Sequence, residues 1–175
     1  TNAANVTTVS GGTTTVGGIA TLGTVTGGVL NLNGATSSVS ILNGGSLNLG
    51  TTALTVASGN TVGTITGGSG SLVKNGAGTL TLGAVTSFGG TTTVNGGTLV
   101  GSVSGALGST SAIAVNGALL NVVDYNSAAL LSVNASGFAT ISGTGLSLAA
   151  VSNANTASDS VYFTGASGTT TLASL

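Results

Sequence analysis

Apolar and polar residues alternate along most of the chain in short runs, such as Val29-Leu30-Asn31-Leu32, Leu54-Thr55-Val56 and Leu80-Thr81-Leu82. Because successive side chains of a strand point to opposite faces, each run predicts a short strand with its aliphatic residues inward and its Thr, Ser or Asn residues outward. No window combines the apolar spacing of a helix with capping residues. The pattern therefore predicts an all-β chain with little or no helix.

Glycine pairs, among them Gly44-Gly45 and Gly89-Gly90, separate these runs. Glycine supplies the positive φ that tight corners need. Asn-Gly steps at Asn43, Asn95 and Asn116 would also suit hairpin turns, so a β-meander is the first alternative. The Asn-Gly corners that precede a Leu-bearing strand, at Asn75, Asn95 and Asn116, recur at a nearly constant interval of about 20 residues, which is typical of a solenoid. We therefore favour the solenoid over the meander.

The period predicts a parallel β-solenoid (β-helix) of about eight coils, each of roughly 16–23 residues. Three short strands and three corners fill about 20 residues, and one coil cannot bury its apolar face alone, so the coils must stack. We expect inward ladders of Leu, Val and Ile and outward ladders of Thr and Asn. The chain is interpreted as one domain, 1–175, with regular repeats over 1–123. The glycine pairs disappear after Asp124-Tyr125, which predicts less regular coils or a cap over 124–175.

The best-preserved unit is Gly76-Ala77-Gly78-Thr79-Leu80-Thr81-Leu82, followed after a spacer by Phe88-Gly89-Gly90-Thr91-Thr92-Thr93-Val94-Asn95-Gly96-Gly97-Thr98-Leu99. It resembles the autotransporter-associated β-strand repeat of bacterial passenger regions, with the best match over 74–123. Phe88 takes a place usually held by Tyr, and Thr93 is one extra residue. The resemblance implies a right-handed parallel β-helix, export, and exposure at the bacterial cell surface. The structural motif positions carried by the match are Gly76, Gly78, Leu80, Leu82, Phe88, Gly89, Gly90, Val94, Asn95, Gly97 and Leu99.

Charge is almost absent: 2% of residues are charged, and Lys74, Asp124 and Asp159 supply all of it. One lysine cannot form the basic stripe that nucleic acid binding needs, so no nucleic acid partner is expected. No stretch approaches the ~20 apolar residues of a membrane span. A nearly neutral surface also opposes self-association only weakly. With no signal segment and no initiator Met, we expect a processed chain or an excised fragment.

Residues that usually carry catalysis are scarce. The sequence has no His, Cys or Glu, so no group can activate a serine and no imidazole or thiolate can hold a transition metal. Asp124 and Asp159 could lie in neighbouring coils, but each is expected to be a solvated corner residue. Lys74 is expected to be an exposed charge at a strand end. We predict no catalytic, cofactor-binding or metal-binding residues, no cofactor and no enzymatic activity.

Two functional hypotheses remain. The first is a structural protein of the bacterial cell surface or extracellular matrix, a stalk or a fibre subunit that associates with itself end to end or laterally through unpaired strand edges. The alternative is a ligand-binding solenoid. The threonine triplets at 13–15, 91–93 and 169–171 suggest an ice-binding array, and an adhesin for glycans or host surfaces is also possible. Tyr125, Tyr162 and Phe163 are expected to pack as a cap rather than to form a sugar-binding platform.

Overall fold

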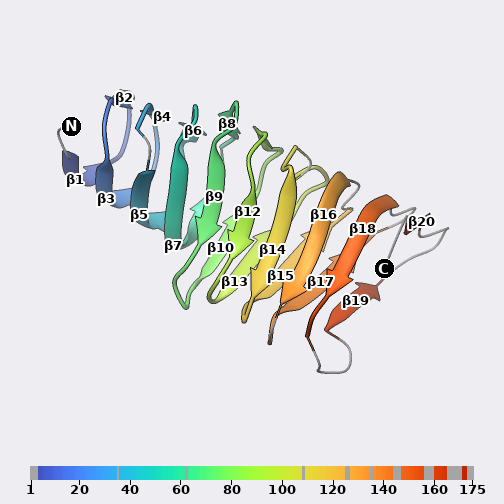
Figure 1. Ribbon diagram of the computed structural model, residues 1–175. Helices are drawn as coiled ribbons and strands as arrows, with labels where there is room; N and C mark the ends of the chain where they lie inside the picture. The colour runs from blue at the N-terminus through green and yellow to red at the C-terminus, as the bar shows by residue number, and fades with distance from the viewer. Residues whose placement is uncertain are drawn as a thin grey trace.

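The chain folds as a rod of parallel strands laid side by side, seen in a computed structural model (Figure 1). Residues 4–34, 36–61, 63–107, 109–124, 127–134, 136–143, 147–155, 160–164 and 171–172 are described. In these ranges the strands form a 15-stranded and a 5-stranded sheet, and no residue is helical. The predicted fold class, a parallel β-solenoid of about eight turns, is confirmed.

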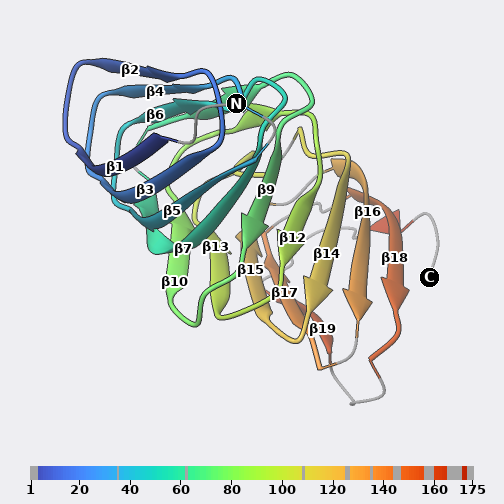
Figure 2. The same cartoon turned by 60° about the vertical axis from the view of Figure 1, so that its left-hand side comes forward.

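The rod has three faces, which we call A, B and C (Figure 2). Face A runs along the whole rod and contains β1 (Ala4–Val9), β3 (Ala20–Val25), β5 (Thr36–Leu42), β7 (Ala53–Thr61), β9 (Ser71–Lys74), β12 (Thr92–Val94), β14 (Ala112–Asn116), β16 (Ser127–Asn134), β18 (Ser147–Asn153) and β20 (Thr171–Leu172). Face B is the 5-stranded sheet of β2 (Thr13–Val16), β4 (Val29–Leu32), β6 (Ser46–Asn48), β8 (Ile65–Gly67) and β11 (Ser87–Phe88). Face C contains β10 (Thr79–Leu82), β13 (Thr98–Gly101), β15 (Leu119–Val123), β17 (Phe138–Ser142) and β19 (Val161–Thr164).

Strand β7 joins faces A and C. Its first half pairs with β9 on face A, and its last residues, from Gly59, pair with β10 on face C. Face B ends at β11, so the predicted coil of three strands is found where β9, β10 and β11 follow one another. Beyond it, the described part of the segment from β13 to β14 forms no strand, but Ala106 and Leu107 are buried. Irregular backbone that still turns aliphatic side chains inward therefore replaces the third strand.

The coils lengthen from the N-terminus to the middle of the rod and vary in length after it, as the paired positions on face A show. Near the N-terminus Ala4 pairs with Ala20, whereas in the middle of the rod Thr92 pairs with Ile113. The last described pair joins Ser147 to Thr171, and its interval lies just above the predicted range. Strands β16 to β20 continue faces A and C, with one register shift between β16 and β18.

Like residues stack on like residues in the core, because parallel pairing in register repeats the inward positions of each coil. On face A one inward ladder consists of Val6, Leu22, Val39, Val56, Lys74, Val94, Val115 and Val133. From Leu22 onward every member is buried. The ladder is aliphatic except at Lys74, which lies within the repeat motif region.

Candidate functional site

The apolar residues of the repeat motif build the core. Leu80, Leu82, Phe88, Val94 and Leu99 are all buried. Within face C, Leu80 of β10 stacks on Leu99 of β13. The structure thus places these motif positions in the packing between coils, away from solvent and from any surface site.

The motif glycines lie where neighbouring coils approach most closely. At Gly97, with φ +64°, an added Cβ would lie 2.6 Å from the carbonyl oxygens of Gly76 and Ala77. At Gly90 it would lie 2.6 Å from the carbonyl oxygen of Ser69. Contacts below 3.0 Å also follow at Gly76, Gly78 and Gly89. These glycines are needed for the distance between coils as well as for turning the corner.

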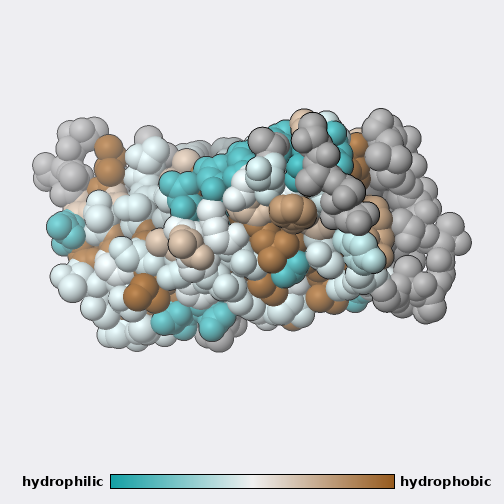
Figure 3. Space-filling view, turned by 90° about the horizontal axis from the view of Figure 1, so that it is seen from below, coloured by the Kyte–Doolittle hydropathy of each residue, from teal (hydrophilic) through white to brown (hydrophobic). Residues whose placement is uncertain are grey.

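An asparagine ladder follows the corner that leaves face A. Asn95 donates from Nδ2 to Oδ1 of Asn75 (3.1 Å), Asn116 donates to Asn95 (2.9 Å), and Asn134 donates to Asn116 (2.8 Å). Each bond joins successive coils. These corners lie at the lower edge of Figure 1 and face the viewer in Figure 3, where hydrophilic residues form a row. The expected outward Asn ladder is present, and it includes the motif residue Asn95.

The prediction for Lys74 is wrong: its side chain points into the core and is 0% exposed. Its Nζ donates to the carbonyl oxygen of Gly76 and, at 2.9 Å, to that of Gly96 in the next coil. Burial lowers the pKa of this amine from its usual value of 10.5, because the charged form loses hydration. Lys74 continues the alternation that makes Leu72 inward, and that alternation outweighs the usual exposure of lysine.

The acidic residues form no cluster in the part of the chain that is described. Asp124 follows β15 with φ 47°, and Asp159 lies outside the described residues, so a pairing of the two is not tested. No group of three or more metal-binding side chains occurs in the described ranges.

The aromatic residues near the C-terminus are exposed, against the expectation of a packed cap. Tyr162 is 54% exposed and Phe163 36% exposed, while Tyr125 lies outside the described residues. Tyr162 pairs with Thr140, and Phe163 continues the inward position of Ile141. Adjacent residues of a strand point to opposite faces, so these two rings cannot form one flat platform.

The threonine triplets do not form a single array. Residues 13–15 belong to β2 on face B, whereas two of residues 91–93 belong to β12 on face A. Thr92 is buried, and its hydroxyl lies 3.1 Å from that of Thr110. Of the third triplet, Thr169 and Thr170 lie outside the described residues. The observation that suggested ice binding is therefore not reproduced by the first two triplets.

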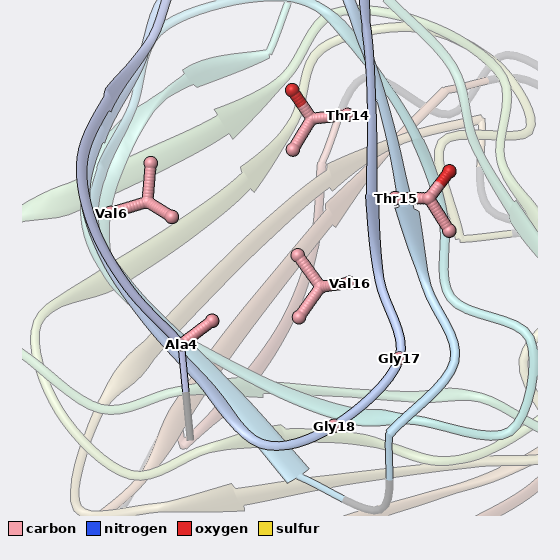
Figure 4. Close-up of a pocket in the computed structure, with 7 residues that line it drawn as sticks. All are labelled: Ala4, Val6, Thr14, Thr15, Val16, Gly17 and Gly18. Carbon is pink, nitrogen blue, oxygen red and sulfur yellow. The ribbon is translucent and has the colours of Figure 1, made fainter. Parts of the chain in front are cut away.

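The first coil leaves an opening at the N-terminal end of the rod. The cavity has a volume of about 360 Å³ and is lined by Ala4, Val6, Thr14, Thr15, Val16, Gly17 and Gly18. Figure 4 shows Val6 and Val16 pointing toward each other across it, while Thr15 points away. Val6 and Ala4 are half-buried because the described chain places no coil on this side of them.

Comparison with known proteins agrees with the repeat. Residues 72–100 match a family model described as passenger-associated-transport-repeat. The resemblance to the autotransporter passenger repeat is confirmed over this segment. Neither the curated proteins nor the solved structures give a match. Within the described residues, no helix is long and apolar enough to cross a membrane.

Proposed function

We propose that this chain is a non-enzymatic structural rod of a secreted protein, exposed at the bacterial cell surface or in the extracellular matrix. The observation that carries the proposal is the unbroken parallel ladder of face A, from β1 to β20, around an aliphatic core. Such a rod holds whatever is attached to its ends at a fixed separation. About eight coils at ~4.8 Å each span roughly 40 Å.

The passenger-type repeat at 72–100 supports the surface location. In the described chain several buried hydroxyls and the one buried amine bond to backbone carbonyls, such as Thr52 to Gly34 (2.5 Å) and Thr86 to Ala106 (2.7 Å), whereas the buried Oγ of Ser37 has no hydrogen-bond partner. These bonds satisfy the core itself and leave few groups poised for chemistry. The balance favours a scaffold over a catalyst.

Antibody labelling of intact bacteria that produce the protein tests the location. A structural surface rod should be labelled on intact cells, and protease added outside the cells should remove the signal. Labelling that needs permeabilised cells would refute the surface proposal. Assays of polysaccharide cleavage with the purified protein test the non-enzymatic part, and turnover above that of the heat-denatured protein would contradict it.

Self-association is a second part of the proposal. Within the described residues β1 pairs with β3 alone, and Val6 is half-buried, so this side of β1 is a candidate contact. Head-to-tail growth would stack the short first coil on the longer coils of the other end, as judged by the pairs Ala4–Ala20, Ala139–Val161 and Ser147–Thr171. In the described chain the first coil carries faces A and B, whereas the C-terminal strands carry faces A and C, so a head-to-tail contact would match strands on face A alone. We therefore favour contacts between equal ends, or lateral contacts, over a head-to-tail fibre.

Sedimentation velocity and electron microscopy distinguish these arrangements. Val6→Glu places a charge in the opening and should prevent association through the N-terminal end. Thr15→Glu is the matched control, because its side chain points away from the cavity. Equal association of both variants would exclude the N-terminal end and leave contacts between C-terminal ends or lateral contacts. Monomeric rods at every concentration would exclude self-association.

An adhesin is the second candidate, because face C carries exposed apolar residues. Phe138 is 40% exposed, Val123 37% and Tyr162 54%. Aromatic rings can bind sugars through their faces, so glycan array binding that is lost in Tyr162→Ala but kept in Thr140→Ala would favour adhesion. No binding across the array would count against it.

A further inference from the structure

Lys74 occupies one position of an otherwise aliphatic ladder. On face A it pairs with Val56 of β7 on one side and with Val94 of β12 on the other. The side chain is fully buried, and its Nζ lies between two corner carbonyls, those of Gly76 in its own coil and Gly96 in the next. The amine therefore joins two successive corners at the coil where face C begins.

Among the described strands that surround Lys74, no charged partner compensates for its burial. These strands, namely β7, β9, β10, β12 and β13, contain no acidic, His, Cys or Tyr residue. A buried cation without a carboxylate depends entirely on its hydrogen bonds. The two corner carbonyls are thus what makes this position acceptable for a lysine.

Register is poorly specified by the surrounding residues. Strands β9, β10 and β12 have three or four residues each, and their inward positions apart from Lys74 are Leu, Val or Thr. A slip of two residues restores the alternation of inward and outward side chains, so apolar burial alone discriminates weakly between registers. A slip of β9 against β12 would move Nζ away from the carbonyl of Gly96 in the next coil, while Gly76, two residues further along the same chain, would move with Lys74. The buried cation would then keep only one of its two hydrogen bonds.

We propose that Lys74 determines the register of β9 against β12, because the observed register brings its Nζ to the carbonyl oxygen of Gly96 at the corner that follows β12. One buried polar group that fixes register, at some cost in stability, has precedent in coiled coils. In this rod Lys74 lies directly before β10, the first strand that lies wholly on face C.

Engineered disulfides can read the register, since the chain has no cysteine. Val73 and Thr93 are paired outward neighbours on β9 and β12. Adjacent parallel strands are ~4.8 Å apart, within the Cα range that a disulfide spans. The reporter is Val73→Cys with Thr93→Cys. The reference pair, Thr21→Cys with Ser38→Cys, lies in the N-terminal coils, away from Lys74.

With Lys74 present, both pairs should oxidise almost completely. In Lys74→Val and in Lys74→Met, the reporter disulfide should fall by about half or more, with the reference disulfide and the far-UV circular dichroism unchanged. Val94→Ala is the control for simple loosening, because it trims the same ladder without removing a hydrogen bond, and it should leave the reporter intact. Undiminished reporter disulfide in both lysine variants would overturn the proposal. So would an equal loss in Val94→Ala, or loss of both disulfides together with the β signal, which would make Lys74 a requirement for folding as a whole.

Discussion

The corner glycine Gly97 offers a direct measure of how closely the coils must approach. Its φ is +64°, and a Cβ would lie 2.6 Å from the carbonyl oxygens of Gly76 and Ala77 and closer still to that of Gly78. The left-handed conformation costs an L-residue about 1–2 kcal/mol. Forcing the methyl group against fixed backbone adds about 1–3 kcal/mol. The lower entropy of the unfolded alanine chain returns about 0.4–1 kcal/mol, so Gly97→Ala should destabilise the rod by about 1–5 kcal/mol.

Gly117 provides the matched control at the corner of the next coil. Its φ is +67°, nearly the same, but a Cβ there meets no atom within 4 Å. Gly117→Ala should therefore show only the conformational cost, about 1 kcal/mol after the entropy gain. The difference between the two variants isolates the contact between coils at about 1–3 kcal/mol.

Urea denaturation followed by far-UV circular dichroism measures this difference. With a slope of about 2 kcal/mol per molar urea, the midpoint of Gly97→Ala should lie about 0.5–1.5 M below that of Gly117→Ala. Equal midpoints would refute the reasoning, because the backbone conformation alone would then account for both glycines.

Three further predictions concern the core, the ladder and pH. Leu80→Ala should lower the free energy of unfolding by about 3–5 kcal/mol because Leu80 is fully buried. Thr81→Ala in the same strand should change it by no more than about 0.5 kcal/mol. Comparable losses of the two variants in urea denaturation would contradict the predicted strand orientation. Asn116→Ala removes one donated and one accepted ladder bond and should cost about 1–2 kcal/mol in the same assay, so an unchanged midpoint would show that the exposed ladder contributes nothing. Burial lowers the pKa of Lys74 in the folded state, so the unfolded chain binds this proton more tightly. Stability should accordingly rise as pH increases from the lowered value toward 10.5, and Lys74→Met should flatten that rise; a fall with pH that Lys74→Met abolishes would reverse the assigned sign.

The strand pattern and the corners could be predicted from the sequence because they depend on local alternation and on a repeated Asn-Gly step. The inward positions of Leu80 and Leu99 and the outward ladder through Asn95 follow from those two features alone. Lys74 could have been placed correctly by the same parity, since it shares a face with Leu72. The general rarity of buried lysine argued the other way. Lys74 can be buried only because its Nζ reaches the corner carbonyls of Gly76 and Gly96, and the position of the Gly96 carbonyl depends on tertiary structure.

The ice-binding array suggested by residues 91–93 and the packed cap expected of Tyr162 and Phe163 were wrong because adjacent residues were given one role. The alternation of a strand assigns adjacent residues to different faces. Thr92 is buried between exposed and half-buried neighbours, and Tyr162 and Phe163 diverge in the same way. The change from face B to face C could not be predicted either, because the buried Ala106 and Leu107 lie in an irregular segment without period-two alternation.

The position of the change of face also explains why the recognisable repeat is so short. The family match at 72–100 runs from β9 to β13, and within it face B ends at Phe88 and face C begins at Thr79. Before it, face C is present only as the last residues of β7, and the later coils lack a face B strand in the described chain. The repeat motif consists of a strand on face C, a spacer that ends in the buried Phe88 on face B, and a strand on face A followed by a glycine corner. Such a motif fits only a coil that has all three faces. The neighbouring coils continue the strand ladder of face A but lack a full strand on face B or on face C. Their sequences therefore keep the alternation of apolar and polar residues without the complete motif.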